Sequence, residues 1–201
     1  MNSIYLYDYA NWFERVLAVA YVRQYSLNGL ERLISYSPFF QKIERDSLMA
    51  PVIDDYTLIR TFFPYMKINL DEIPVYNQCL WAAESYLRIQ KETGLTFEAI
   101  FLYCPIKKMY EYFGLFHEMD FSQIVNEFKG LYLKQSILDI LLKRFKYTIA
   151  YVAEKTSISS ETLYSVKSRR RDIKKLNVES VTKIANVFNV RIETIAELKT
   201  Q

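Results

Sequence analysis

The chain has 201 residues, of which 51% are hydrophobic and 24% are charged. This balance excludes a disordered protein, and the length accommodates one or two domains with a buried core. The four Gly and five Pro are too few for the frequent turns of an all-β protein, so we predict an all-α fold.

Charge divides the chain into two parts. Residues 1–133 carry 12 Lys and Arg against 16 Asp and Glu, whereas residues 134–201 carry 14 against 7. We therefore predict an acidic N-terminal domain and a basic C-terminal domain that meets an anion. Aromatic residues divide the other way, because only five follow residue 133: Phe145, Tyr147, Tyr151, Tyr164 and Phe188.

Few residues are available for metal or redox chemistry. Cys79 and Cys104 are the only cysteines and His117 is the only histidine, so we expect no zinc site and no cofactor. The thiols are expected to be buried and reduced, and His117 to lie on the surface near a helix end. The start of the chain has no basic segment, and the longest apolar run, residues 16–22, is short. We expect a cytoplasmic protein with no signal peptide and no membrane span.

The first predicted helix covers residues 3–25 and is apolar almost all round, which is typical of a central helix. Asn28-Gly29 is expected to end it, and a short helix at residues 30–36 is expected to stop at Ser37-Pro38. Residues 56–63 fit a short helix or a strand. Most aromatic side chains of this region are expected in the core.

Pro74 is expected to open the next helix, which ends at Thr93-Gly94. Thr96 is expected to cap a further helix, which Pro105 either kinks or splits. Asp120 is expected to cap a helix that bends at Gly130 or continues through residue 145, in which case one long helix joins both domains.

Acidic pairs at Asp54-Asp55 and Asp71-Glu72 lie in segments bounded by proline, where acids commonly serve as turn and cap residues. A lone His117 makes neither a catalytic triad nor a metal site. We therefore expect that the protein is not an enzyme.

The C-terminal part has its own helical pattern. Residues 152–156 read Val-Ala-Glu-Lys-Thr, the turn Ser157-Ile158-Ser159 follows, and Asn189-Val190 ends a later helix. The predicted helices are 134–145, 149–156, 160–168, 178–188 and 193–198. This order and spacing resembles the Cro/XRE-type, lambda-repressor-like helix-turn-helix domains. Where that family usually has Gly, this chain has Ser157 and Arg169, and residues 172–175 look like a small insertion.

The resemblance implies that the helix from Ser160 enters the major groove of double-stranded DNA. By position, it implies base contacts from Ser160, Glu161, Tyr164 and Ser165. It also implies phosphate contacts, which set affinity more than sequence choice, from Ser159, Lys167, Ser168, Arg169, Arg170, Arg171, Lys174 and Lys175.

Two functions remain open from the sequence. The first is a sequence-specific DNA-binding transcriptional regulator that acts as a homodimer, with residues 1–133 as a sensing, dimerisation or partner-binding domain. The alternative is a protein-interaction module, such as an antitoxin-like or phage-defence inhibitor. Its N-terminal domain would bind a partner protein and its helix-turn-helix would autoregulate.

Overall fold

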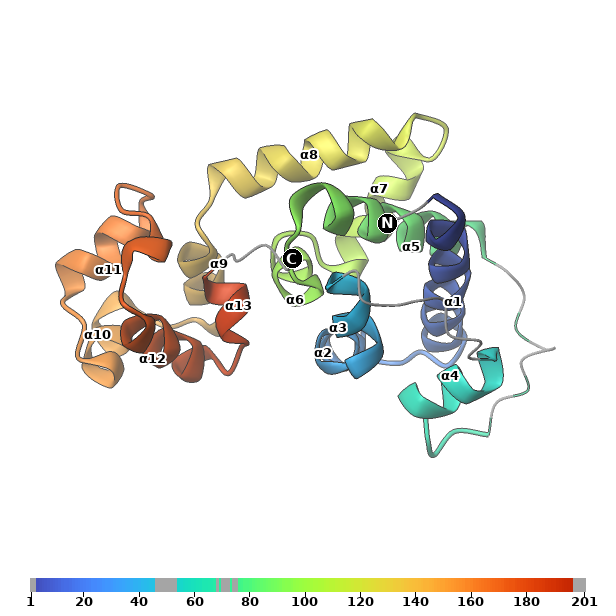
Figure 1. Cartoon of the computed structure of the whole chain (residues 1–201), viewed down its shortest axis with the longest axis horizontal. Helices are drawn as coiled ribbons and strands as arrows, with labels where there is room; N and C mark the ends of the chain where they lie inside the picture. The colour runs from blue at the N-terminus through green and yellow to red at the C-terminus, as the bar shows by residue number, and fades with distance from the viewer. Residues whose placement is uncertain (1–2, 46–53, 68, 70–72, 74–75, 197–201) are drawn as a thin grey trace.

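The computed structural model describes residues 3–45, 54–67, 69, 73 and 76–196. These residues form helices joined by loops, with no strand among them, which confirms the all-α prediction. Figure 1 shows an elongated molecule in which α1 to α7 gather at one end and α9 to α12 at the other. We call α1 to α8 the N-terminal part and α9 to α13 the C-terminal part.

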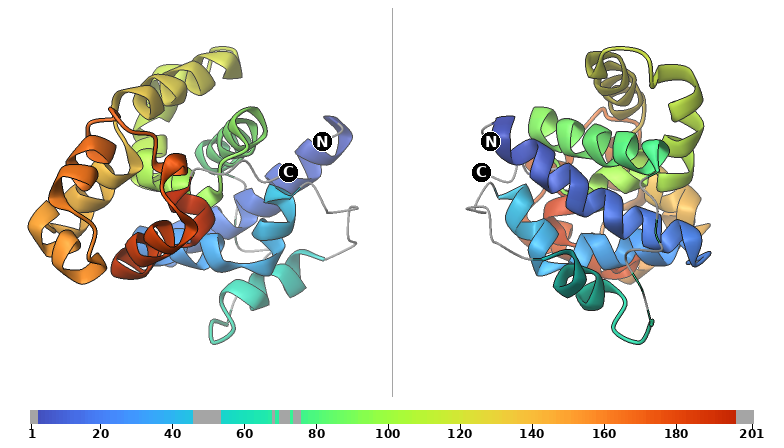
Figure 2. Two further views of the ribbon diagram at one scale, coloured as in Figure 1. Left: turned by 60° about the vertical axis from the view of Figure 1, so that its left-hand side comes forward. Right: turned by 90° about the vertical axis from the view of Figure 1, so that its right-hand side faces the viewer.

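The core of the N-terminal part is built on two long helices. Helix α1 (Ser3–Val22) packs along α5 (Asn77–Thr93), and Figure 2 shows the two side by side. Phe13 of α1 lies with its ring centroid 4.8 Å from Phe40 and 5.9 Å from Tyr86, at the spacing that aromatic pairs prefer. All three side chains are buried, as predicted for most aromatics of this region.

Three short helices follow α1, and the first of them begins at Leu27 and not at the predicted residue 30. They are α2 (Leu27–Tyr36), α3 (Pro38–Glu44) and α4 (Asp55–Phe62). Asn28-Gly29 lies inside the first turn of α2, because the Ser26 hydroxyl caps that helix by accepting from the Gly29 N–H at 3.3 Å. Pro38 opens α3, a position where its missing N–H costs nothing.

The segment that fitted a helix or a strand is the helix α4, which Asp54 caps by accepting from the Thr57 N–H at 2.9 Å. Helix α5 begins at Asn77, so Tyr76 is its N-cap; the predicted opening residue, Pro74, lies outside the described residues. The predicted end is confirmed, because Gly94 takes a left-handed conformation with φ of 67°.

Pro105 splits the next helical segment. Thr96 caps α6 (Phe97–Tyr103) as predicted, and α7 (Ile106–Phe116) begins directly after the proline. The C-cap of α7 is His117, whose ring stacks on Phe113. Cys79 and Cys104 are both buried and free, as predicted, and burial raises the pKa of the two thiols to about 11 and about 12.

No single helix joins the two parts. Helix α8 (Phe121–Lys134) is capped by Asp120 and continues through Gly130, but the chain is extended at Gln135. The Ser136 hydroxyl then accepts from the Asp139 N–H at 3.1 Å and starts α9 (Ile137–Phe145). The alternative of one long helix, which the sequence left open, is therefore excluded, because this local cap competes with helix continuation. Lys134 ends α8 and does not open the next helix.

The next three helices agree closely with their predicted ranges, whereas the last helix ends at Ile195, short of the predicted 193–198, of which residues 197 and 198 lie outside the described residues. Residues Val152, Leu163, Val166, Ile184 and Phe188 of the first three are buried and belong to a hydrophobic core that is continuous with the core of the N-terminal part. The predicted insertion is a short 3-10 helix, η2, whose Ile173 is also buried. The elements are α10 (Ile149–Thr156), α11 (Ser160–Lys167), η2 (Ile173–Lys175), α12 (Val178–Phe188) and α13 (Ile192–Ile195).

Candidate nucleic-acid interface

The turn between α10 and α11 is fixed by two local hydrogen bonds. Ser157 has φ of 58°, the left-handed conformation that favours Gly, and its N–H donates to the Ala153 carbonyl at 2.8 Å. Two residues later, Ser159 caps α11 by accepting from the Thr162 N–H at 3.2 Å. The chain therefore makes a tight helix-turn-helix, and the buried Leu163 and Val166 set which face of α11 points inward.

The outward face of α11 carries the side chains predicted to contact bases. Ser160, Glu161 and Tyr164 are exposed, with Tyr164 at 54% exposure, and Ser165 is half-buried. They occupy two turns of one helix, a size that fits the major groove. The structure therefore brings all four predicted residues together on one side of the chain.

The predicted phosphate contacts lie around the ends of α11. Ser159, Arg170 and Arg171 are exposed, and so are Lys174 and Lys175 of η2. The Ser168 hydroxyl donates to the Tyr164 carbonyl at 2.8 Å and accepts from Arg170 Nε at 3.1 Å.

Lys167 is half-buried, and its Nζ lies 3.7 Å from Oδ1 of Asp139 in α9. The positive charge of Lys167 is therefore partly neutralised.

Arg169 makes contacts within the protein that were not predicted. Its backbone has φ of 57°, a left-handed conformation, and its guanidinium donates from Nη2 to the carbonyls of Tyr132 and Gln135 at the end of α8. It also lies 5.2 Å from the centroid of the Tyr132 ring. Both bonds come from one nitrogen, so a phosphate contact by Nη1 or Nε would not have to break them. Arg169 therefore joins the end of α11 to α8, a role that its place in a run of arginines did not indicate.

A second contact holds the same end of α11. The Ser136 hydroxyl donates to the Lys167 carbonyl at 2.8 Å. Together with Arg169, this bond ties the last turn of α11 to the turn between α8 and α9. Ser136 lay inside the predicted helix 134–145 with no role of its own, although a Ser three residues before Asp139 is a recognisable helix-cap signal.

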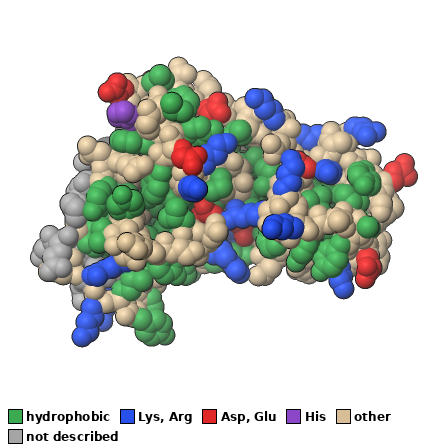
Figure 3. All heavy atoms as spheres, turned by 180° about the vertical axis from the view of Figure 1, so that it is seen from behind, with side chains coloured by type: hydrophobic (Ala, Val, Ile, Leu, Met, Phe, Trp, Pro, Cys, Tyr) green, Lys and Arg blue, Asp and Glu red, His purple; other side chains and the backbone are tan. Residues whose placement is uncertain are grey.

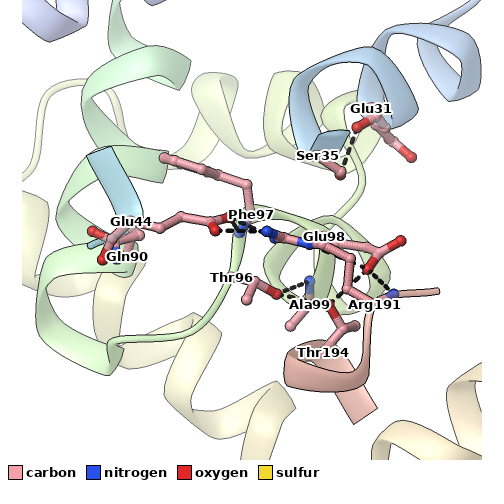
Figure 4. Close-up of polar contacts among 10 residues, drawn as sticks. All are labelled: Glu31, Ser35, Glu44, Gln90, Thr96, Phe97, Glu98, Ala99, Arg191 and Thr194. Atoms are coloured by element: carbon pink, nitrogen blue, oxygen red, sulfur yellow. Dashed lines mark hydrogen bonds and ion pairs between the residues drawn. The ribbon is translucent and has the colours of Figure 1, made fainter. Parts of the chain in front are cut away.

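Buried carboxylates fasten the C-terminal part onto the N-terminal part (Figure 4). Arg191 donates from two nitrogens to Glu44 at 2.8 and 2.9 Å, and Glu44 also accepts from the Phe97 N–H at 2.6 Å. Glu98 accepts from the Arg191 N–H at 2.9 Å and from the Thr194 hydroxyl at 2.7 Å. Burial raises the pKa of the Glu44 carboxyl, and Arg191 lowers it only in part.

A second ion pair also joins the N-terminal and C-terminal parts, and we call the boundary between them the junction. Glu31 of α2 is 3% exposed, and its carboxylate accepts from Arg144 of α9 at 2.8 Å and from the Ile106 N–H at 2.9 Å. The Tyr36 hydroxyl donates to the Asn189 carbonyl at 3.1 Å. These contacts join residues far apart in the sequence, and no local pattern marks them. The helix-turn-helix is therefore held in a fixed orientation on the N-terminal part.

The surface charge is uneven. Figure 3 shows the face of the molecule opposite to the one in Figure 1. On this face, lysine and arginine side chains gather in the middle and over the C-terminal part, with fewer over the N-terminal part. A concentrated positive field of this kind attracts polyanions. Among the described residues, no three His, Cys, Asp or Glu side chains cluster in a way that would hold a metal ion, and no helix is both long and apolar enough to cross a bilayer.

Comparison of the chain with protein-family models, with curated proteins and with solved structures found no significant match. The resemblance to the Cro/XRE domains therefore stays a prediction from the sequence. The structure itself shows left-handed residues after three helices of the C-terminal part, namely Ser157, Arg169 and Asn189.

Proposed function

We propose that the protein is a sequence-specific, DNA-binding transcriptional regulator of the Cro/XRE type. One observation carries the proposal: α11 buries Leu163 and Val166, presents Ser160, Glu161 and Tyr164 outward, and is followed by exposed cations. An exposed polar face is common to surface helices, and it is the exposed cations directly after this helix of a helix-turn-helix that favour contact with DNA.

In this proposal, α11 lies in the major groove. Ser160 and Ser165 exchange hydrogen bonds with base edges, the Glu161 carboxylate accepts from cytosine N4, and Tyr164 contacts a base edge or a thymine methyl. Arg170, Arg171, Lys174 and Lys175 contact phosphates of the flanking backbone, with Ser159, Lys167 and Ser168 at the ends of α11. These contacts bring affinity and a steep salt dependence, and the base contacts bring sequence choice.

One α11 reads one half-site, so a homodimer on a two-fold symmetric site is the natural assembly. Residues 1–133 would then supply sensing, dimerisation or partner binding, and the protein would act in the cytoplasm. The ion pairs of Arg191 and Arg144 with the buried carboxylates of Glu44 and Glu31 support a rigid connection, through which an event in the N-terminal part reaches α11.

The test is DNA affinity as a function of salt. The variant R170A/R171A should bind mixed genomic fragments more weakly, and the slope of log affinity against log salt should fall by about two, since two phosphate contacts are lost. The matched control is K91A/K107A, which removes two exposed cations of the N-terminal part and should leave the slope unchanged. The proposal is wrong if the wild type binds DNA no better than R170A/R171A at low salt.

An interaction with a partner protein remains the second candidate. Leu115 and Met119, at the turn between α7 and α8, are 65% and 53% exposed, which is unusual for large apolar side chains placed so close together. If this surface binds a protein, L115S/M119S in the full chain should lose a partner that the wild type retains. R170A/R171A should retain that partner.

A further inference from the structure

A cavity of about 520 Å³ lies where the two parts of the molecule meet. We call it the junction cavity. Its walls come from α6, α7 and the end of α8 on one side and from α9 on the other, and its volume is within the usual range for small-molecule sites. Residues that line it include Leu102, Lys108, Leu131, Ile140, Lys143 and Arg144.

The charged side chains of the junction cavity are all cations. Lys143 pairs with Asp139 at 2.6 Å and Arg144 pairs with Glu31 at 2.8 Å, but neither acid lines the cavity. The Lys108 ammonium lies 5.3 Å from the centroid of the Tyr112 ring, and no carboxylate of the described residues is within ion-pair distance of it. Lys108 is therefore the uncompensated cation of this lining, and an anionic group in the cavity would neutralise it while also facing Lys143 and Arg144.

The rest of the wall is apolar. Leu102 of α6, Leu131 of α8 and Ile140 of α9 supply hydrocarbon surface, and Pro105 lies between α6 and α7. A ligand that fits both halves of this lining has a carboxylate or phosphate on a compact apolar body. Inorganic phosphate alone would leave the apolar wall uncovered, and a neutral hydrocarbon would leave Lys108 without an anionic partner.

The junction cavity is also connected to the end of α11. Gln135 lines it, and the Gln135 carbonyl accepts from the Arg169 guanidinium and from the Tyr103 hydroxyl. The next residue, Ser136, donates its hydroxyl to the Lys167 carbonyl. A ligand that moves Gln135 and Ser136 therefore moves two of the groups that position the last turn of α11.

We propose that the junction cavity binds a small amphipathic organic anion, and that its occupancy changes the position of α11 through Gln135 and Ser136. The anion bridges Lys108 of α7 and the Lys143–Arg144 pair of α9, so it contacts both parts of the molecule at once. The effect on DNA rests on the proposed function. The binding of the anion does not, because it depends only on the cavity.

Binding is tested by calorimetry on the full chain with hexyl phosphate and hexanoate as probes, and with hexanol and inorganic phosphate as comparison ligands. We expect saturable binding of at least one amphipathic anion at one site, and weaker or no binding of the two comparison ligands. K108A should weaken the binding about tenfold, K108R should restore it, and K107A, which removes the neighbouring exposed cation outside the cavity, should leave it unchanged. The site is refuted if neither anion binds, if hexanol binds as tightly, or if K108A binds as the wild type does.

The transmission to α11 is tested by measuring DNA affinity with and without the probe that binds. We expect the probe to change the affinity of the wild type several-fold, and DNA to change the affinity for the probe by the same factor. R169A, which releases Gln135 from α11, should reduce that factor. If the probe binds and DNA affinity does not change, the transmission is refuted. If the chain binds the probe but no DNA, the proposed function fails and the anion site stands.

Discussion

The N-terminal and C-terminal parts are held together internally in different ways. The N-terminal part is built on the long helices α1 and α5, with buried rings such as Phe13, Phe40, Tyr86 and Phe97 between its elements. The C-terminal part has helices of 4 to 11 residues, and the non-glycine residues Lys146, Ser157 and Asn189 end three of them in the left-handed conformation. The part that carries the proposed DNA contacts thus depends more on left-handed backbone at its helix ends.

The largest expected effect comes from the junction. R191M should lower the free energy of unfolding by about 3–5 kcal/mol, because it leaves the buried carboxylates of Glu44 and Glu98 without their cation. R170M, which changes an exposed arginine in the same way, should change it by less than about 0.5 kcal/mol. Urea unfolding measures both. Equal stabilities of the two variants would show that the junction does not hold the C-terminal part.

A smaller effect is expected from the left-handed residues Ser157 and Arg169. S157G should raise the free energy of unfolding by about 1 kcal/mol, since it relieves the left-handed backbone and removes no side-chain contact that fixes the turn. R169G relieves the same strain but loses the bonds to Tyr132 and Gln135, so it should not stabilise the protein. A gain of the same size in both variants would contradict the role of Arg169 in joining α11 to α8.

The smallest expected effect concerns the two cysteines of the N-terminal part, which should not react with a thiol reagent in the native protein. Burial raises the pKa of Cys79 to about 11 and of Cys104 to about 12, so both stay protonated thiols from pH 7 to 9. A thiol-specific disulfide reagent should label neither in the native protein and both in urea. Rapid labelling of native protein at pH 8 would show that the N-terminal part opens far more readily than its packing indicates.

The two parts also differ in how well their helix ends can be predicted from the sequence. Helix ends of the C-terminal part carry local signals, such as the caps Thr148, Ser159 and Asn177 and the left-handed Asn189, so their ranges were predictable. In the N-terminal part Asn28-Gly29 was misleading, because a serine two residues earlier caps α2. Here one local signal, the serine cap, outweighs another, the Asn-Gly pair.

The junction was not predictable from the sequence. Glu44 and Arg191 are 147 positions apart and Glu31 and Arg144 are 113 apart, so no spacing or periodicity pairs them. The contacts of Arg169 within the protein were not predictable either. Within a run of three arginines it looks like a phosphate contact, and only the position of α8 shows that its guanidinium is bound to protein.

The central claim is that α11 reads a DNA sequence, and selection from random double-stranded DNA tests it most directly. The full chain should enrich a short motif with two-fold symmetry, and E161A or Y164A should alter particular positions of that motif while leaving salt dependence unchanged. R170A/R171A should weaken binding and keep the motif. Failure of the wild type to enrich any motif, or enrichment of an identical motif by E161A and Y164A, would contradict the account.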